Sequence, residues 1–398
     1  MSDVSFPEEA VWIGSDHPFD LHEAYLCFRR AWRIERQPER AELFITADSR
    51  YKLWINGQFV ARGPARSWPH AQCLDRLDLA PYLQSGNNIL AAQVYQPGYS
   101  HFAYVHRGTA GLLAWLVCDG ETMLMTDRDW RTRRDPSFAA AVERISIYGT
   151  GVEERDLSQD DGWQSPGYGD SRWANARVIA PLGGYPWTGL QLRPLPLLVE
   201  REIPMTLIET RRGPLPPSPD ADAHEALRRG WTVANPTPVS SDRLRVSRPT
   251  AEAATTNWVG IELSNAEAAY YLFDFGRDFI GQGWIEIENA GGEECVALSY
   301  AEKIRDGQLI LSDPETYCRV RMTDRFHLRP GNQVAETFAL RGGRYLLFQL
   351  TGPTDPDLRL RFHARVAEYP LEILRPLEAS DPLLTRIIRL CEDTFRAC

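Results

Sequence analysis

The chain has no cluster of basic residues and no long apolar run. Its 398 residues carry 44 Lys and Arg against 54 Asp and Glu, which gives a formal net charge of −10. Proteins bind a phosphate backbone through groups of Lys and Arg that displace counterions, so nucleic acid is not expected as a partner. No stretch approaches the roughly 18 continuous apolar residues of a membrane-spanning helix, so no membrane association is expected.

The cysteines lack the spacing of a metal site or of a disulfide framework. Seven are scattered along the chain without a CxxC pair. They are Cys27, Cys73, Cys118, Cys295, Cys318, Cys391 and Cys398. The opening residues MSDVSFPEEAVWIG contain no basic n-region and no apolar core, so no secretory signal is expected. Dispersed thiols in such a chain are typical of reduced cytoplasmic proteins, and we expect cytoplasmic localisation, no metal site and no cofactor.

Aromatic residues are abundant, with 12 Trp, 15 Tyr and 15 Phe. Aromatic side chains pack well on pleated surfaces, so this content favours β-sheet cores. Rings also stack on the faces of sugars, and an acidic surface neither attracts nor excludes a neutral sugar. A sheet core is the simpler interpretation, and carbohydrate is the candidate ligand.

Segments with period-two alternation recur along the chain. In Arg50–Ile55, the apolar residues Tyr51, Leu53 and Ile55 share one face, and Asn56-Gly57 is the strongest short hairpin signal. The continuous apolar run from Leu112 to Val117 predicts a central strand. Such strands without intervening helical repeats predict an all-β protein of two antiparallel β-sandwich domains of jelly-roll, galactose-binding-like type, followed by a short C-terminal helix.

Proline-rich segments suggest the domain organisation. Pro194-Leu195-Pro196 places a boundary after a first sandwich at 1–196, and the second sandwich is expected at 197–370. Residues 211–250 are interpreted as an irregular surface insertion, because Gly213-Pro214 and the prolines that follow fit neither a helix nor a central strand. One or two helical turns are expected at 221–229.

The spacing of apolar residues changes from strand-like alternation to helical periodicity in the last part of the chain, 371–398. After Ser380-Asp381-Pro382, which supplies a cap and a first-turn proline, apolar residues recur at helical spacing. They are Leu384, Ile387, Ile388, Cys391 and Phe395. Before that, residues 358–366 alternate apolar and basic side chains, which indicates a half-buried strand with a solvated basic face.

Two segments of the first predicted domain resemble the bacterial α-L-rhamnosidases. The first, residues 46–60, looks like the N-terminal jelly-roll module of that family, although similar Asn-Gly hairpins occur in the galactose-binding-like domains of other glycosidases. The second, Gly162-Trp163 followed by Asp170-Ser171-Arg172-Trp173, is also shared by several glycosidase sandwiches. The resemblance therefore begins near Leu43.

The second predicted domain carries the more specific motif. Residues 273–278 read Phe-Asp-Phe-Gly-Arg-Asp and run through Gly281 and Gly283 into Leu298–Glu302. This pattern is similar to the "DFGR…YAE" signature of the rhamnosidase β-domain that precedes the catalytic barrel. Residues 338–346, with Arg344-Tyr345, match a further pattern of the same domain. The resemblance reaches the C-terminus.

The resemblance implies a chain without catalysis of its own. In the family, a helix like the last one here leads into an (α/α)6 barrel with the two carboxylates of an inverting mechanism, and no residue here matches either carboxylate. The acidic pairs Glu153-Glu154 and Asp160-Asp161 are interpreted as solvated loop charges. With no barrel to cover it, the apolar stripe of the last helix predicts weak self-association.

A carbohydrate site on the first sandwich is the remaining candidate. The loop after Val94 is aromatic and polar at a strand end, where rings and a few hydrogen bonds define a shallow sugar site. The candidate residues are Trp68, His70, Tyr95, Tyr99, His101 and Tyr104. Because this loop departs from the family's calcium-binding pattern, the calcium site is not carried over.

Several alternatives stay open. The aromatic loop residues also fit simple loop packing, and Asp48, Arg50 and Asn56 are interpreted as hydrogen-bonding turn residues. The favoured hypothesis is a rhamnosidase-like scaffold that also binds sugar. A free-standing lectin-like module would bind sugar alone, and an active enzyme of unrecognised mechanism would show turnover.

Overall fold

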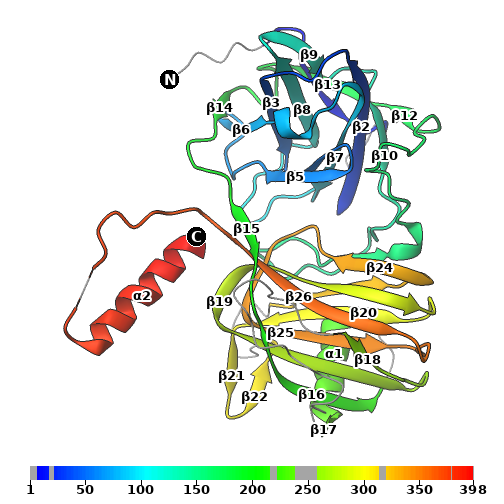
Figure 1. The fold of residues 1–398 in the computed structure, drawn as a ribbon, viewed down its shortest axis with the longest axis vertical. Helices are drawn as coiled ribbons and strands as arrows, with labels where there is room; N and C mark the ends of the chain where they lie inside the picture. Colours follow the sequence, from blue (N-terminus) through cyan, green and yellow to red (C-terminus); the bar gives the residue numbers. More distant parts are fainter. Residues whose placement is uncertain are drawn as a thin grey trace. The chain divides into compact units, whose positions relative to one another are not determined.

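The computed structural model describes residues 7–17, 22–215, 222–237, 258–312, 320–377 and 379–397. The chain divides into two compact units (Figure 1). Unit 1 comprises Met1–Gly151 and Gln159–Pro194, and unit 2 comprises Val152–Ser158 and Leu195–Cys398. The chain thus enters unit 2 for a short segment, 152–158, returns to unit 1, and leaves it again at Pro194.

Unit 1 is a β-sandwich of two mainly antiparallel sheets. The first has the order β13-β1-β8-β3-β6-β14, with β9 beside β8. Its strands are β1 Val11–Gly14, β3 Ala41–Asp48, β6 Gln72–Asp78, β8 Gly111–Cys118, β9 Glu121–Met125, β13 Arg177–Pro181 and β14 Leu190–Leu192. The second has the order β12-β10-β2-β7-β4-β5. Its strands are β2 Ala24–Ile34, β4 Arg50–Ile55, β5 Gln58–Gly63, β7 Gly86–Gln96, β10 Arg131–Arg134 and β12 Ala174–Asn175.

The predicted hairpin is confirmed. Strands β4 and β5 pair with Ile55 opposite Gln58, and Asn56 and Gly57 connect them with φ of 51° and 82°. Positive φ at both central residues is the geometry for which Asn-Gly is selected. The Asn56 amide donates to the Tyr82 carbonyl at 3.0 Å and accepts from the Ile89 N–H at 2.9 Å, so this residue fixes the turn as expected.

The loop 162–175 covers the outer face of the second sheet. Trp163 and Trp173, 1% and 7% exposed, pack on Cys27 and Ala91 of that sheet. Arg29, 1% exposed, donates to the carbonyls of Ser165 and Tyr168 at 3.1 and 3.2 Å. Much of the tryptophan content thus covers sheet faces, which agrees with the simpler interpretation of the aromatic composition.

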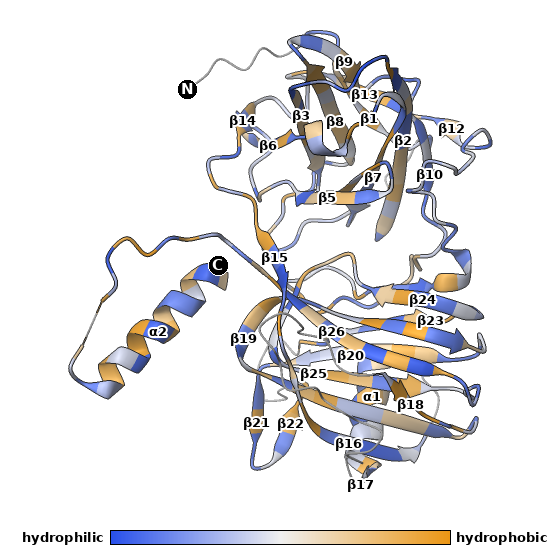
Figure 2. Cartoon of the chain, in the orientation of Figure 1, coloured by the Kyte–Doolittle hydropathy of each residue, from blue (hydrophilic) through white to orange (hydrophobic). Residues whose placement is uncertain are grey.

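Unit 2 contains one large sheet that folds into two layers (Figures 1 and 2). Its main path is β11-β23-β20-β25-β19-β16-β17, while β26 and β24 pair with the second half of β19. The bounds are β11 Glu154–Asp156, β15 Val199–Glu202, β16 Thr206–Pro214, β17 Asn235–Thr237, β18 Val259–Gly260, β19 Glu267–Ala290, β20 Cys295–Ala301, β23 Thr323–His327, β24 Gly331–Glu336, β25 Arg341–Thr351 and β26 Arg359–Glu368. A separate hairpin joins β21 Lys303–Arg305 to β22 Gln308–Ile310.

The long strand β19 links the two layers of unit 2. Its first half pairs with β16 and β25, and its second half pairs with β24 and β26. Aromatic side chains from both layers meet in the core between them, where the ring of Phe273 lies 5.6 Å from that of Phe348 and 5.2 Å from that of Phe362. The fold class expected from the sequence, β-sandwich domains with little helix, is confirmed.

The segment 211–250 differs from the expected irregular insertion. Residues 211–214 continue β16, which pairs with β19 on one side and β17 on the other. Helix α1, Ala223–Val233, is longer than expected, and its Leu227 and Trp231 pack on Tyr270 and Leu272 of β19. Asp222 is the N-cap of α1, and its side chain accepts from the Glu225 N–H, so one free N–H of the first helical turn is satisfied. Residues 216–221 and 238–250 of the predicted insertion lie outside the described residues.

The basic face expected on residues 358–366 is not simply solvated. In β26, Arg361 pairs with Glu286, and Arg365 lies 3.7 Å from Glu200 and 3.4 Å from Glu336. His363 is 2% exposed and stacks on Trp284 at 3.7 Å between ring centroids. The prediction of a strand here is right, but Arg361 and Arg365 of its basic face pair with carboxylates of neighbouring strands, whereas Arg359 is exposed.

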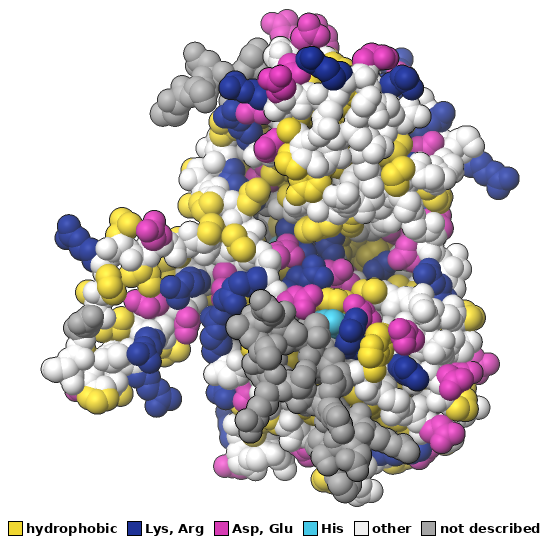
Figure 3. All heavy atoms as spheres, in the orientation of Figure 1, with side chains coloured by type: hydrophobic (Ala, Val, Ile, Leu, Met, Phe, Trp, Pro, Cys, Tyr) yellow, Lys and Arg dark blue, Asp and Glu magenta, His cyan; other side chains and the backbone are white. Residues whose placement is uncertain are grey.

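Helix α2, Pro382–Ala397, is the predicted amphipathic helix. Among its described residues none is buried, and Leu384, Ile387 and Phe395 are 51%, 46% and 70% exposed. Hydrophobic side chains are visible on its surface in Figure 3. Asp393 lies 3.7 Å from Arg277 of β19, which itself binds Glu368 at 2.7 Å. The helix therefore adds little buried surface to unit 2.

Deleting the chain from residue 378 onward is expected to lower the stability of unit 2 by at most about 1 kcal/mol, because an exposed ion pair such as Arg277–Asp393 contributes little. The deletion also removes the exposed apolar stripe, so any concentration-dependent self-association should decrease. Thermal melting and sedimentation of the deleted and full chains check both expectations. Unfolding on deletion would show that α2 belongs to the native core.

Candidate functional site

The candidate carbohydrate residues lie at one end of the unit 1 sandwich. Strand register places Arg50 opposite Tyr95, Ala24 opposite Gln96, and Asp48 opposite Gly111. The ends of β2, β3, β4, β7 and β8 therefore meet beside the loop 97–110. Several side chains that are far apart in sequence become neighbours there.

Glu23 anchors the tyrosines of this end. Its carboxylate, on a residue that is 6% exposed, accepts from the Tyr95 hydroxyl at 2.6 Å, from the Tyr99 hydroxyl, and from the Gly151 N–H at 3.0 Å. Burial and the hydrogen bond to Glu23 raise the pKa of Tyr99, so its hydroxyl stays protonated and keeps donating. The half-buried Tyr99 ring is thereby held in one orientation.

Asp48 orients Tyr104 of the loop, as Glu23 orients Tyr99. It accepts from the Tyr104 hydroxyl and, at 2.7 Å, from the indole N–H of Trp187. Asp48 is 3% exposed, so both donors satisfy a carboxylate that has little water around it. Asp48 is therefore a buried support of the loop instead of the turn residue that the sequence suggested.

His101 lies between the two tyrosines. Its ring centroid is 6.5 Å from that of Tyr99 and 5.6 Å from that of Tyr104. Burial, together with the charges of Arg50, Arg144 and Arg66, lowers the pKa of His101 to about 4. The imidazole is therefore neutral at pH 7 and offers one donor and one acceptor to a hydroxyl-rich ligand.

The six predicted site residues divide into three groups. Tyr99, His101 and Tyr104 are partly exposed and are brought together, whereas Tyr95 is 2% exposed and presents no ring to solvent. Trp68, 61% exposed, stacks on the exposed His70 at 6.4 Å between ring centroids. Tyr95 is thus buried beneath the cluster and cannot contact a ligand. The other five predicted residues keep accessible surface.

Sequence reasoning missed the charged residues of this end. The Arg144 guanidinium lies 4.4 Å from the Tyr99 ring centroid, and that of Arg50 lies 5.0 Å from the Tyr95 ring centroid. Phe102, 84% exposed, meets Tyr148 at 5.8 Å between ring centroids. Phe102 stands inside the predicted loop, but Glu23 and Arg144 have no sequence signal because they reach the site only through the fold.

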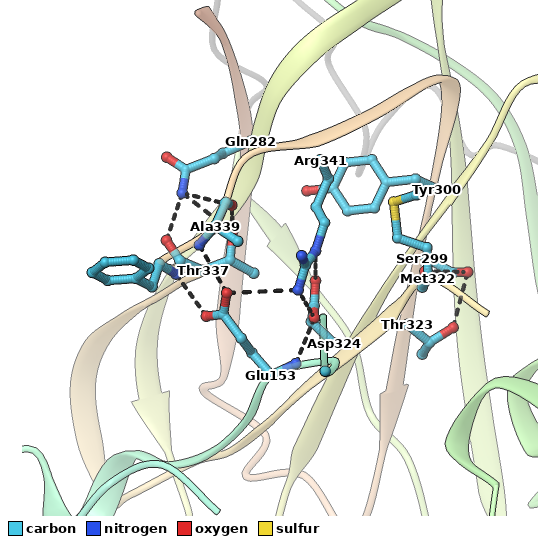
Figure 4. Close-up of polar contacts among 12 residues, drawn as sticks. Glu153, Gln282, Ser299, Tyr300, Met322, Thr323, Asp324, Thr337, Ala339 and Arg341 are labelled. Atoms are coloured by element: carbon cyan, nitrogen blue, oxygen red, sulfur yellow. Dashed lines mark hydrogen bonds and ion pairs between the residues drawn. The ribbon is translucent and has the colours of Figure 1, made fainter. Parts of the chain in front are cut away.

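Glu153 and Glu154 are not solvated loop charges, contrary to the sequence interpretation, whereas Asp161 is exposed and pairs with an arginine at the surface. The Glu153 side chain has no exposed surface; it accepts from the N–H groups of Phe338 and Ala339 at 2.6 and 2.8 Å (Figure 4). Glu154 binds Arg325 at 2.6 Å and His327 at 3.0 Å. Asp161 binds Arg133 at 2.7 Å. The Glu153 and Glu154 carboxylates are therefore structural.

A buried charge network surrounds Glu153 in unit 2 (Figure 4). Arg341 donates to both oxygens of Asp324, at 2.8 and 2.6 Å, and lies 3.6 Å from Glu153. Asp324 also accepts from the Glu153 N–H at 2.7 Å. Burial raises the pKa of Glu153, while Arg341 and the two backbone donors oppose that rise. The network fixes segment 152–158 to unit 2.

The motif residues of the second unit hold strands together. Asp274 forms two hydrogen bonds with Arg344, both of 2.9 Å, which join β19 to β25. The Tyr300 hydroxyl accepts from the Gly283 N–H at 2.8 Å and so joins β20 to β19. Both contacts explain the pattern that resembles the rhamnosidase β-domain, and they assign these residues structural functions.

The described ranges contain neither a metal-binding cluster nor a membrane-spanning helix. Within them, no three His, Cys, Asp or Glu side chains gather where they could hold a metal ion. Neither helix of the described part of the chain is long and apolar enough to cross a membrane. The five cysteines that the structure describes, Cys27, Cys73, Cys118, Cys295 and Cys391, are free.

Two curated proteins resemble this chain in sequence. An α-L-rhamnosidase of Streptomyces avermitilis is 28% identical over 185 residues, which cover 44% of this chain and 15% of that protein. An α-L-rhamnosidase of Alteromonas sp. (strain LOR) is 22% identical over 376 residues, which cover 90% of this chain and 34% of that protein. The chain thus spans about a third or less of the length of these relatives.

A solved structure shares the fold over nearly the whole chain. The family 78 glycoside hydrolase rhamnosidase of Bacillus sp. GL1 superposes with a TM-score of 0.78 and 21% identity, covering 95% of this chain and 57% of that one. Residues 36–184 match the α-L-rhamnosidase N-terminal domain. These residues therefore form an α-L-rhamnosidase N-terminal domain, and the chain has the β-sandwich fold of the N-terminal portion of the α-L-rhamnosidase family.

Proposed function

We propose that this chain is the non-catalytic β-sandwich portion of an α-L-rhamnosidase, which supports a catalytic domain and binds carbohydrate through unit 1. The domain match at residues 36–184 carries this proposal. The structural functions of Glu153, Asp274 and Arg344 support it, because these polar groups are committed to internal contacts. The five free cysteines favour a reducing compartment, for which we propose the cytoplasm.

The proposed carbohydrate contacts are Trp68, His70, Tyr99, His101 and Tyr104. Exposed rings give stacking surfaces, and a neutral imidazole gives a donor and an acceptor, which suits the alternating apolar faces and hydroxyls of a sugar. Glu23 and Asp48 orient the tyrosines by accepting from their hydroxyls. We propose L-rhamnose units as the ligand, since the matched relatives carry the name α-L-rhamnosidase.

The purified 398-residue chain is expected to release no nitrophenol from an aryl α-L-rhamnoside. Inverting hydrolysis needs a general acid and a base about 6.5 to 9.5 Å apart across the scissile bond, and neither has a sequence match here. A colorimetric assay at high protein concentration tests this. Turnover that survives repurification and disappears with one acidic-residue variant would contradict the non-catalytic assignment.

Replacing Trp68 or Tyr99 by alanine is expected to weaken L-rhamnose binding by about 1 to 3 kcal/mol, by analogy with stacking of bases on aromatic rings. Calorimetric titration with millimolar rhamnose measures this loss. Tyr185→Ala is the matched control, because Tyr185 is another exposed ring of unit 1, 73% exposed, outside the cluster. Absence of heat from the unchanged protein would show that the cluster aromatics only pack.

A further inference from the structure

A tight turn at residues 101–104 of unit 1 holds the His101 ring in place. The His101 N–H donates to the Tyr104 carbonyl at 3.0 Å, and the Tyr104 N–H donates to the His101 carbonyl at 3.1 Å. The rings of Tyr99 and Tyr104 are the neighbours of the imidazole. The ring is therefore oriented by the turn and by two aromatic side chains before any ligand binds.

One further hydrogen bond of this turn determines which nitrogen of the imidazole carries the hydrogen. The Ala103 N–H donates to Nδ1 of His101 at 3.3 Å. Because burial and nearby arginines lower the pKa of His101 to about 4, the ring carries a single hydrogen at pH 7. A nitrogen that accepts a hydrogen bond cannot hold that hydrogen, so it lies on Nε2. The acceptor of the ring is thus used within the turn.

The Nε2–H group of His101 is left for a ligand. Nε2 forms no hydrogen bond with any residue that the structure describes. It is also not one of the unpartnered side-chain atoms that are shielded from solvent in the described part of the chain. This donor can therefore be reached from outside, on a ring whose orientation is fixed.

The two neighbouring tyrosines cannot supply a second donor. The Tyr99 hydroxyl donates to the Glu23 carboxylate, and the Tyr104 hydroxyl donates to the Asp48 carboxylate. A hydroxyl has one hydrogen, so toward a ligand both oxygens can only accept. Of the three rings Tyr99, His101 and Tyr104, His101 alone has a hydrogen to give.

We infer that the Nε2–H of His101 donates to one hydroxyl oxygen of the bound sugar and so determines which sugar the site accepts. This inference rests on the proposed carbohydrate binding by unit 1. Stacking on a ring has little directional requirement, whereas a fixed N–H needs an oxygen at one place. A sugar without a hydroxyl there leaves the half-buried donor unpaired and binds more weakly.

The position of the hydrogen can be tested without a ligand. Nitrogen NMR of the full chain, labelled at its 8 histidines, reports which ring nitrogen is protonated, and loss of one signal in His101→Asn assigns His101. At pH 7 we expect a hydrogen on Nε2 and none on Nδ1. A hydrogen on Nδ1 instead, or on both nitrogens, would overturn the inference.

A matched pair of variants tests the contact itself. Asparagine places its amide near the position of Nδ1, and glutamine places its amide near that of Nε2. His101→Asn should weaken binding of methyl α-L-rhamnoside about three- to tenfold, the range of one neutral hydrogen bond, while His101→Gln should retain most of the affinity. Calorimetric titration measures both. His327→Asn, the same change at a partly exposed histidine of unit 2, should leave binding unchanged.

Sugar analogues identify the oxygen that is bound. One of the three monodeoxy methyl α-L-rhamnosides should bind the unchanged chain about three- to tenfold more weakly, and it should lose no further affinity in His101→Asn. Additive losses for every analogue, or equal affinities of the His101→Asn and His101→Gln variants, would overturn the inference and leave the rhamnose site in place. No binding of methyl α-L-rhamnoside to the unchanged chain would overturn the proposed carbohydrate binding, and the inference with it.

Discussion

Replacing Arg341 by methionine is expected to destabilise unit 2 by about 3 to 5 kcal/mol. The side chain is 4% exposed and supplies the cation of the network in Figure 4. Its removal leaves the Asp324 and Glu153 carboxylates buried with no opposing charge, and both have 0% exposed side-chain surface. Urea unfolding followed by fluorescence measures the change, and hydrogen exchange of β20, β23 and β25 localises it to unit 2.

The matched control is Arg359→Met on the exposed side of β26, where the same change should alter stability by no more than about 0.5 kcal/mol. A second variant tests the cause. Adding Glu153→Gln to Arg341→Met removes one of the two uncompensated charges, so part of the lost stability should return. If Arg341→Met unfolds at the same urea concentration as the unchanged protein, the network contributes nothing to stability.

Local patterns predicted the elements whose signal lies within their own residues. The Asn56-Gly57 hairpin, the central strand β8 and the helix α2 follow from turn chemistry and periodicity, which act within about a dozen residues. The end of strand β16 was not predicted, because the sequence Gly213-Pro214 is typical of a loop. Pro214 ends the strand, and a Cβ at Gly213 would lie 2.8 Å from Ala234 Cα, so the close approach of the chain after α1 requires glycine there.

Long-range contacts explain what the sequence could not predict at the candidate site. Glu23 forms a hydrogen bond with Tyr95, 72 residues away in sequence, and Glu153 forms one with Phe338, 185 residues away. An acidic residue that will be buried has the same local appearance as a solvated one, because its partners come from other strands. The aromatic loop 95–104 was visible as composition at a strand end, whereas the groups that orient its rings appeared only with the fold.

Replacing Gly281 by alanine is expected to destabilise unit 2 by about 3 kcal/mol or more, at or beyond the upper end for overpacking. Gly281 is the residue of β19 that pairs with both Arg341 of β25 and Val366 of β26, at the passage between the layers. A Cβ there would lie 1.9 Å from the Arg365 carbonyl oxygen. That oxygen belongs to a paired strand, so relieving the clash requires β26 to move.

Two neighbouring glycines provide graded comparisons for this variant. At Gly283 the added Cβ would meet Leu346 Cδ2 at 2.2 Å, and a side-chain end rotates more easily than a strand moves, so Gly283→Ala should cost less than Gly281→Ala. At Gly260 the nearest atom would be the Leu358 carbonyl oxygen at 3.8 Å, an ordinary contact, so Gly260→Ala should change stability little. Urea midpoints of the three variants test the order. Equal midpoints for Gly281→Ala and Gly260→Ala would show that β26 can move to accept the added Cβ. The close approach of β19 to β26 at Gly281 would then not limit the stability of unit 2.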